Sequence, residues 1–246
     1  MAPFEYKCFD LSNLQLNQEG IMRFLMGVLG LLWVGCQGPQ KKEAPSTVQE
    51  KEVIESLPPI QKKIILFFGN SITAGYQLDM NQAFPAIIQH KIDSLGLSYQ
   101  VINAGLSGET TASGKNRIDW VLRTVPDIFI LELGANDGLR GLPLRETPKN
   151  LQVIIDKVKS INPEVKIIIT GMEVPPNLGE SYTRQFRNIF STLAKNNAVA
   201  LIPFLLIDVA GKPTLNLADG IHPTPEGHLL IAELVWKTLL PLLELN

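Results

Sequence analysis

A serine, a histidine and an aspartate occur where they could together carry out nucleophilic catalysis. Ser71 lies in a small polar turn after an apolar run, and Asp219 and His222 lie three residues apart in one loop. A serine hydroxyl becomes an effective nucleophile when a base lies within hydrogen-bond reach and a third group orients that base. We therefore assign Ser71 as the candidate nucleophile, His222 as the base and Asp219 as the acid that orients it.

The chain has three histidines, and their positions distinguish them as candidates for the base. His90 falls within the first predicted helix and His228 within the last, where either could be a surface residue. His222 lies instead in a loop and has a carboxylate three residues upstream. This arrangement favours His222 as the base.

Acyl transfer also needs hydrogen-bond donors for the negative oxygen of its tetrahedral intermediate, and removing one typically costs about 3 kcal/mol. Three groups near predicted strand ends could donate: the backbone N–H of Ser71, the backbone N–H of Gly105 and the side-chain amide of Asn136. Each lies in a sequence that could equally be an ordinary turn. Their joint occurrence at strand ends, together with the candidate base and acid, favours catalysis.

Strands and helices alternate along the second part of the chain. Apolar patterns predict strands at 62–68, 99–104, 127–133, 165–170 and 199–204, and helices at about 84–95, 118–125, 151–161, 182–193 and 225–243. The first strand lacks polar alternation, which indicates a sheet covered on both faces. We therefore predict one α/β domain with a five-stranded parallel sheet, whose ligands lie at the carboxyl ends of the strands.

The composition limits the classes of function. Apolar residues make up 45% of the 246 residues, which is ample for a core, and the formal net charge of −2 gives no electrostatic case for binding nucleic acid. The two cysteines, Cys8 and Cys36, both precede the predicted domain. A disulfide framework or a cysteine-based metal site is therefore not expected there.

Residues 1–36 form an N-terminal extension with the pattern of a secretory signal. An apolar run at 24–34 follows Met22-Arg23, and it is shorter than the roughly 20 residues that span a bilayer. The following Gly35-Cys36 resembles the end of a bacterial lipobox, in which the cysteine is lipidated, with Trp33 where leucine is usual. Translation could also start at Met22, and an uncleaved anchor or a buried helix is the alternative. Polar residues 37–59 predict a flexible linker to a domain at 60–246.

Four blocks of this sequence resemble, in order, the motifs of SGNH (GDSL-type) hydrolases: 69–76, 103–110, 133–141 and 219–223. Within that family the chain is most similar to the bacterial arylesterase branch, which includes periplasmic thioesterase/protease/lysophospholipase enzymes. The resemblance implies a flavodoxin-like, three-layer α/β/α fold without a metal or an organic cofactor. It also implies that Ser71 is the nucleophile, that Gly105 and Asn136 contribute to the oxyanion hole, and that Asp219 and His222 complete the triad.

Asn70 departs from the family pattern, which usually has aspartate immediately before the nucleophilic serine. Asparagine is nearly isosteric with aspartate but neutral, and it brings two N–H donors that need acceptors. We therefore expect the electrostatics of the turn to differ while Ser71 remains the nucleophile.

These observations predict a secreted serine esterase, anchored through Cys36, that hydrolyses carboxylic esters or thioesters. Its substrates could be aryl or acyl esters, acyl-CoA or lysophospholipids, and residues 172–179 are expected to line the acyl pocket. A carbohydrate acetylesterase, or a non-catalytic lipid- or glycan-binding lipoprotein on the same scaffold, is the alternative. The physiological substrate and the oligomeric state are left open by the sequence.

Overall fold

The computed structural model describes residues 62–244, so the expected signal segment, Cys36 and the whole predicted linker lie outside the described residues. The strands within this part are β1 (Lys63–Gly69), β2 (Tyr99–Gly105), β3 (Ile128–Glu132), β4 (Lys166–Thr170) and β5 (Ala200–Ile202). They form one sheet in the order β2-β1-β3-β4-β5, and every neighbouring pair is parallel. The predicted five-stranded parallel sheet is confirmed.

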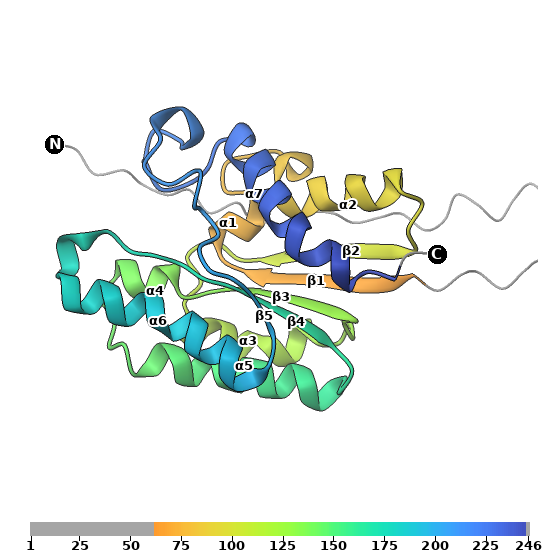
Figure 1. Cartoon of the computed structure of the whole chain (residues 1–246), viewed down its shortest axis with the longest axis horizontal. Helices are drawn as coiled ribbons and strands as arrows, with labels where there is room; N and C mark the ends of the chain where they lie inside the picture. Colours follow the sequence, from red (N-terminus) through yellow and green to blue (C-terminus); the bar gives the residue numbers. More distant parts are fainter. Residues whose placement is uncertain (1–61, 245–246) are drawn as a thin grey trace, which may run out of the picture. The chain divides into compact units, whose positions relative to one another are not determined.

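Helices cover both faces of this sheet (Figure 1). The longer helices are α2 (Phe84–Ser94), α3 (Thr111–Val121), α5 (Glu146–Ile161), α6 (Glu180–Asn197) and α7 (Pro225–Leu239). Helices α2 and α7 pack together on one face, and α3, α5 and α6 cover the other. The result is the three-layer α/β/α architecture that the family resemblance implied.

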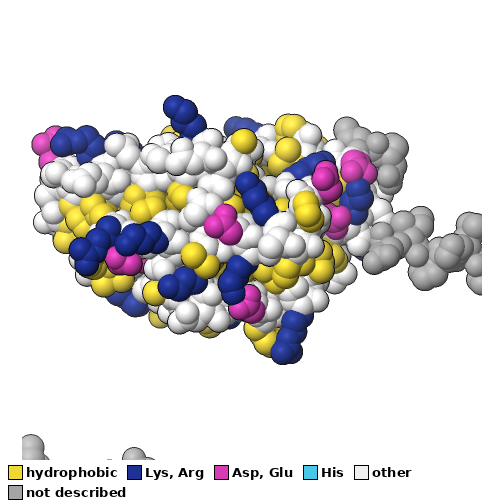
Figure 2. All heavy atoms as spheres, turned by 90° about the horizontal axis from the view of Figure 1, so that it is seen from below, with side chains coloured by type: hydrophobic (Ala, Val, Ile, Leu, Met, Phe, Trp, Pro, Cys, Tyr) yellow, Lys and Arg dark blue, Asp and Glu magenta, His cyan; other side chains and the backbone are white. Residues whose placement is uncertain are grey.

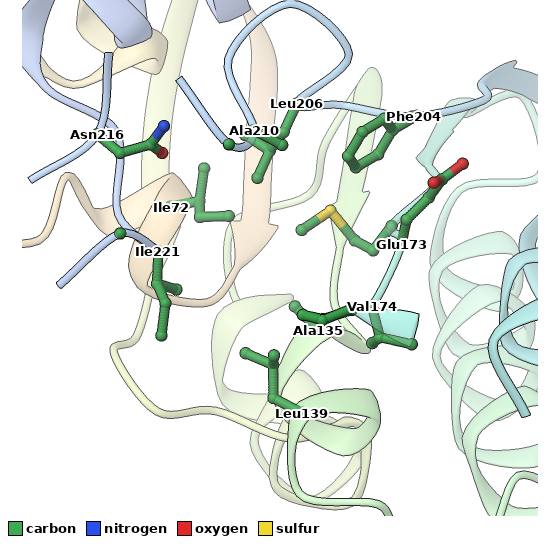
Figure 3. A pocket seen from close by; sticks show the side chains of 14 residues that line it. Ile72, Ala135, Leu139, Glu173, Val174, Phe204, Leu206, Ala210, Asn216 and Ile221 are labelled. Carbon is green, nitrogen blue, oxygen red and sulfur yellow. The ribbon is translucent and has the colours of Figure 1, made fainter. Parts of the chain in front are cut away.

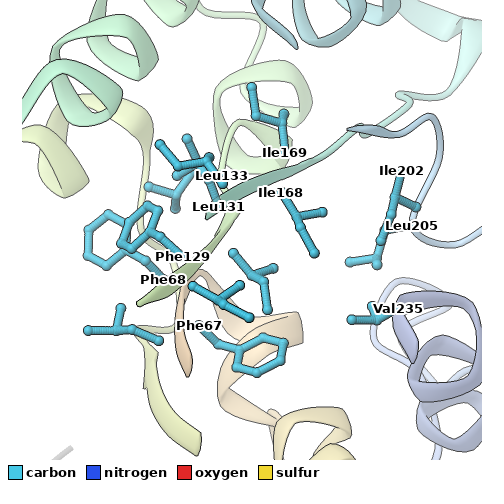
Figure 4. Packing of buried hydrophobic residues seen from close by; sticks show 14 of the residues in the cluster. Phe67, Phe68, Phe129, Leu131, Leu133, Ile168, Ile169, Ile202, Leu205 and Val235 are labelled. Carbon is cyan, nitrogen blue, oxygen red and sulfur yellow. The ribbon is translucent and has the colours of Figure 1, made fainter. Parts of the chain in front are cut away.

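Strand β1 shows why these strands are apolar along their whole length. Successive side chains of a strand point to opposite faces, and here each face meets a helix layer. The ring of Phe67 packs edge-on against Phe84 of α2, with centroids 5.4 Å apart. The ring of Phe68 stacks on Phe129 of β3, with centroids 5.8 Å apart. These side chains belong to the buried core shown in Figure 4.

Two elements end earlier than the sequence pattern indicated, and a proline explains each difference. Strand β5 stops at Ile202 because Pro203 has no N–H to donate to the sheet. Helix α7 stops at Leu239, and a 3-10 turn, η4 (Leu240–Leu242), contains Pro241. A proline cannot continue an α-helix interior.

Short helices occupy strand ends where the sequence suggested simple turns. They are α1 (Ser71–Ala74) after β1 and α4 (Ala135–Leu139) after β3, and three 3-10 turns, η1 (Met80–Gln82), η2 (Pro176–Leu178) and η3 (Pro213–Leu215), lie in other loops. Helix α3 also begins before its apolar stripe, because the Thr110 side chain accepts a hydrogen bond from the Ser113 backbone N–H. Such a side-chain cap lets a helix start in a polar segment.

The surface on the side of α3, α5 and α6 carries basic side chains scattered singly or in pairs, with acidic side chains among them (Figure 2). Ion pairs between these helices and their neighbours include Lys157 with Asp119 and Arg187 with Glu173. Among residues 62–244, every helix is too short or too polar to span a bilayer.

Candidate active site

The carboxyl edge of the sheet brings together the three side chains selected as a catalytic triad. The Ser71 Oγ atom lies 2.9 Å from Nε2 of His222, and Nδ1 of the same ring lies 2.7 Å from Oδ2 of Asp219. Ser71 and His222 are 151 positions apart along the chain. The geometry is that of a nucleophile, a base and an orienting acid.

Asp219 accepts hydrogen bonds from the backbone of His222 as well as from its ring. Its Oδ1 atom accepts hydrogen bonds from the backbone N–H groups of Ile221, at 2.9 Å, and His222, at 3.0 Å. The His222 backbone N–H, then its ring, and then the Ile221 N–H lower the pKa of Asp219 to about 2. The carboxylate therefore stays ionised at neutral pH and favours the His222 tautomer with its proton on Nδ1.

The loop that carries Asp219 and His222 is fixed to the domain at its base. Asn216 is buried, and its side-chain amide donates to the carbonyl oxygens of Val209, at 2.7 Å, and Lys212, at 2.9 Å. The Leu217 backbone N–H donates to the carbonyl of His222 at 2.7 Å. These hydrogen bonds fix the position of the loop that carries His222. Tyr76 also packs on the His222 ring, with centroids 4.3 Å apart.

Ser71 is the first residue of α1, and Asn70 caps this short helix. The Asn70 side-chain oxygen accepts the Ile72 backbone N–H at 2.9 Å, as expected of an N-cap. Ser71 is buried, with an exposed fraction of 8% for the residue. The cap therefore fixes the backbone at the position from which Oγ meets His222.

A buried carboxylate that the sequence analysis did not single out lies beneath this turn. Glu132 ends β3, is fully buried, and receives hydrogen bonds from both Asn70 and Thr73. Its Oε1 accepts the Asn70 amide at 2.7 Å, and its Oε2 accepts the Thr73 hydroxyl at 2.8 Å and the Asn70 backbone N–H at 3.1 Å. The Thr73 backbone N–H adds a fourth bond at 3.3 Å. Glu132 thus links the end of β3 to the turn that carries Ser71.

The environment of Glu132 works in two directions on its pKa. Burial raises the pKa to about 7, while the hydrogen bonds from Thr73 and Asn70 act to lower it. Gly69 provides the necessary space, since a Cβ there would lie 2.6 Å from Oε2 of Glu132 and 2.1 Å from Oγ1 of Thr73. A glycine before Asn70 is therefore required by the buried carboxylate as much as by the turn.

Gly105 lies beside the nucleophile turn, but its N–H already has an acceptor. That N–H donates to the side-chain oxygen of Asn103 at 2.9 Å, and the Asn103 amide donates to the Thr73 carbonyl at 2.8 Å. A Cβ at position 105 would meet the Ala74 backbone nitrogen at 2.3 Å. The glycine is therefore explained by close packing against α1, and Asn103 is a second positioning residue that the sequence analysis missed.

Asn136 is half-buried in α4, and one of its amide hydrogens is also used. Its Nδ2 donates to the Glu109 carbonyl at 3.0 Å. The Glu109 side chain is buried and paired with Arg117, which lies over the Phe68 ring and donates to the Ala104 carbonyl. These contacts orient the Asn136 amide, whose second hydrogen has no hydrogen-bond acceptor within residues 62–244.

The other two histidines are not in the triad. His90 is an exposed residue of α2. His228, which the sequence allowed to be a surface residue, is buried in α7, where its Nδ1 accepts the Phe84 backbone N–H at 3.1 Å. Burial lowers its pKa to about 4, so it is neutral and acts as a structural acceptor. Within residues 62–244, no cluster of three or more His, Cys, Asp or Glu side chains could hold a metal ion.

A pocket of about 420 Å³ opens beside the nucleophile turn, and we call it the Ile72 pocket. Figure 3 shows Ile72 and Ile221 on one side, Leu139 and Ala135 below, and Phe204 opposite. Of the stretch 172–179 that was expected to line an acyl pocket, residues 172–175 contribute to the lining of this one. Because Ile72 and Ile221 adjoin Ser71 and His222 in sequence, this mostly apolar pocket begins next to those two residues.

Comparison with known proteins assigns the fold and site to a class. The model of the GDSL-like lipase/acylhydrolase family matches residues 67–230, so the chain belongs to this family. It is a hydrolase of carboxylic esters or thioesters, as the motif blocks predicted.

The relatives that it matches are enzymes of that kind. An arylesterase from Vibrio mimicus is 37% identical over 176 residues, covering 71% of this chain and 87% of the relative. The thioesterase 1/protease 1/lysophospholipase L1 of Escherichia coli K12 is 36% identical over 179 residues, covering 72% and 84%. The crystal structure of TesA, at 36% identity, superposes with a TM-score of 0.70 over 74% of this chain and 100% of that one.

Proposed function

We propose that this hydrolase works through an acyl-enzyme formed on Ser71, with His222 as base and Asp219 as its orienting acid. The continuous contacts from Asp219 through His222 to Ser71 Oγ support this assignment. Neutral His222 accepts the serine proton as Oγ bonds to the carbonyl carbon. The ester C–O or thioester C–S bond then breaks, and the leaving alcohol or thiol takes that proton. A water molecule, deprotonated by His222 in the same way, releases the carboxylic acid and restores Ser71.

The negative oxygen of the intermediate would be held by donors from three strand ends. The Ser71 backbone N–H and the second amide hydrogen of Asn136 are the principal ones in this proposal. The Gly105 N–H would take part only by leaving or sharing its present acceptor, Asn103. Preorganised donors of this kind stabilise charge that develops in the transition state.

The Ile72 pocket is proposed as the site of the acyl group. Its volume of about 420 Å³ and its apolar lining suit an acyl chain longer than acetyl. A carbohydrate acetylesterase would need little of this space, so the pocket favours an acyl or aryl esterase, or a thioesterase, over that alternative. An acyl series of p-nitrophenyl esters decides between them, because a sharp fall beyond acetyl would favour the acetylesterase.

Covalent labelling tests the assignment of the nucleophile directly. A fluorophosphonate probe should react with the folded protein at Ser71, as located by peptide mass spectrometry. Ser71→Ala should remove the label, whereas Ser107→Ala, which changes an exposed serine in the loop after β2, should keep it. A folded protein that takes no label, or takes it at another residue, would refute the acyl-enzyme proposal.

We also propose that the protein is exported and anchored through a lipidated Cys36, with residues 37–59 as a tether. The signal-like run and the lipobox-like ending of the N-terminal segment support this. Stable attachment needs more than one acyl chain, as a lipoprotein has. Cys36→Ser should move the protein from the membrane to the soluble fraction while Cys8→Ser should not. Continued pelleting of Cys36→Ser with membranes would refute the anchor.

A further inference from the structure

The Ile72 pocket and a second hollow beside it share part of their lining. Besides the Ile72 pocket, a groove of about 500 Å³ is lined by side chains that include Arg187, Leu201, Pro203 and Ile207, and we call it the Arg187 groove. Glu173 and Phe204 line both hollows. These two side chains therefore form the wall that separates the pocket beside Ser71 from the groove.

The ring of Phe204 is the larger part of this wall. Phe204 directly follows Pro203, at the point where β5 has ended, and it is half-buried. In Figure 3 the ring lies across the pocket from Ile72 and Ile221, which adjoin the reacting residues. A chain that starts at Ser71 and runs along the pocket therefore meets Phe204 at its far side.

Glu173 turns its charge away from the pocket, which keeps the wall apolar on the substrate side. Figure 3 shows its carboxylate pointing outward beside Phe204. Two contacts to Arg187 of α6 hold it there, Nε to Oε1 at 2.8 Å and Nη2 to Oε2 at 3.0 Å. A planar two-point pair of this kind fixes direction as well as distance. The Glu173 stem, rather than its charge, therefore completes the wall next to Phe204.

We propose that Phe204 sets the upper length of the acyl chain that this hydrolase accepts. This inference rests on the proposed function, in which the Ile72 pocket receives the acyl group. Each methylene buried along the pocket should raise kcat/KM by about fourfold, until the chain reaches the ring. Further methylenes then have no space in the pocket. An adjoining groove lined by Leu201, Pro203 and Ile207 lies beyond the ring, and it would receive them once the ring is removed.

The experiment compares chain-length profiles of kcat/KM on p-nitrophenyl esters from acetyl to dodecanoyl, each below its critical micelle concentration. Phe204→Ala should move the maximum by at least two methylenes toward longer chains. It should raise the ratio of dodecanoyl to hexanoyl hydrolysis by about tenfold or more. Phe204→Trp should move the maximum toward shorter chains. Leu139→Ala, which removes apolar surface from another side of the same pocket, should leave the maximum in place.

The outcomes separate this inference from the function on which it rests. If the wild-type protein hydrolyses none of the esters, the proposed function itself fails. If it hydrolyses them and both Phe204 variants keep the wild-type maximum, the role of Phe204 is overturned. Circular dichroism checks the fold of each variant, and Phe204→Trp decides alone if Phe204→Ala does not fold.

Discussion

Asn70→Asp restores the residue that the family usually has, and the structure predicts a pH-dependent cost for this change. The new carboxylate can still accept the Ile72 N–H through Oδ1, so the cap on α1 is retained. The other oxygen, however, takes the place of an amide that donates to Glu132 Oε1 at 2.7 Å. Two buried carboxyl groups then face each other and must share a proton.

The magnitude follows from proton linkage. Glu132 alone already has a pKa raised by burial to about 7. A second carboxylate about 3 Å away adds about 5 kcal/mol of repulsion at an effective dielectric constant of about 20, which is more than three pKa units. The folded variant therefore keeps one proton above pH 7 that the unfolded chain has released, and its stability falls as pH rises. The slope is about 1.4 kcal/mol per pH unit, or about 2 kcal/mol between pH 7 and 8.5.

Urea unfolding at pH 7 and at pH 8.5 measures this effect as the difference in unfolding free energy between Asn70→Asp and the wild type. His228 does not interfere, because burial lowers its pKa to about 4 and it is neutral throughout this range. The control is Asn70→Asp combined with Glu132→Gln, in which the introduced glutamine amide can donate to the aspartate and the extra slope should vanish. At pH 7 the single variant should keep kcat/KM within about tenfold of the wild type, because the triad is untouched.

A difference that does not change with pH would show that the two carboxyl groups do not share a buried proton. Loss of most activity at pH 7 with an intact fold would show instead that this chain has adapted its nucleophile turn to the amide.

Two further predictions follow from the same contacts. His222→Ala should lower kcat by several orders of magnitude, while His90→Ala on the exposed face of α2 stays within about tenfold, measured on one aryl ester; the reverse result would eliminate the triad. The second concerns Glu132→Gln. In the wild type the folded pKa of Glu132 is raised from 4.5 to about 7, so its contribution to stability is lost as pH rises through that window, and the substitution removes this contribution. His228, with its pKa lowered from 6.5 to about 4, contributes the opposite slope. These two groups should therefore leave the stability of the wild type nearly constant between pH 4.5 and 6.5, whereas the stability of Glu132→Gln should fall by about 2 kcal/mol on acidification over that range. Urea unfolding of both proteins at pH 4.5 and at pH 6.5 checks this. The same change in unfolding free energy for wild type and variant would contradict it.

The sheet was predictable from the sequence because each strand is a short apolar run that can be recognised without knowledge of its neighbours in space. Phe67 contacts Phe84 of α2 and Phe68 lies against Arg117 of α3, so an unbroken apolar run indicates a strand buried on both faces. Asp219 and His222 were predictable as a pair for a similar reason, since three residues in one loop keep them close. Strand ends were less predictable, because Pro203 interrupts a run that is otherwise apolar.

Glu132 could not be assigned from the sequence, although a signal was present. It is the charged residue that ends the otherwise apolar β3, a position that also suits an exposed strand end. Its function depends on contacts with Asn70 and Thr73, 62 and 59 positions away, which the sheet order β1-β3 creates. The burial of His228 was left open for the same reason, because its buried contact with Phe84 joins α7 to α2 across 144 positions.

The Asn70–Glu132 contact also changes the interpretation of the residue before the nucleophile. Considered alone, an asparagine in place of the family aspartate removes a negative charge from the turn. In the structure the turn still has a carboxyl group directly beneath it, and the Asn70 amide supplies one of the four donors that favour its ionised form. An aspartate at position 70 would compete with Glu132 for a proton, whereas the amide lets Glu132 ionise with its oxygens paired. The sequence departure at Asn70 is therefore compatible with a well-ordered Ser71, and Glu132 supplies the carboxyl group of the turn.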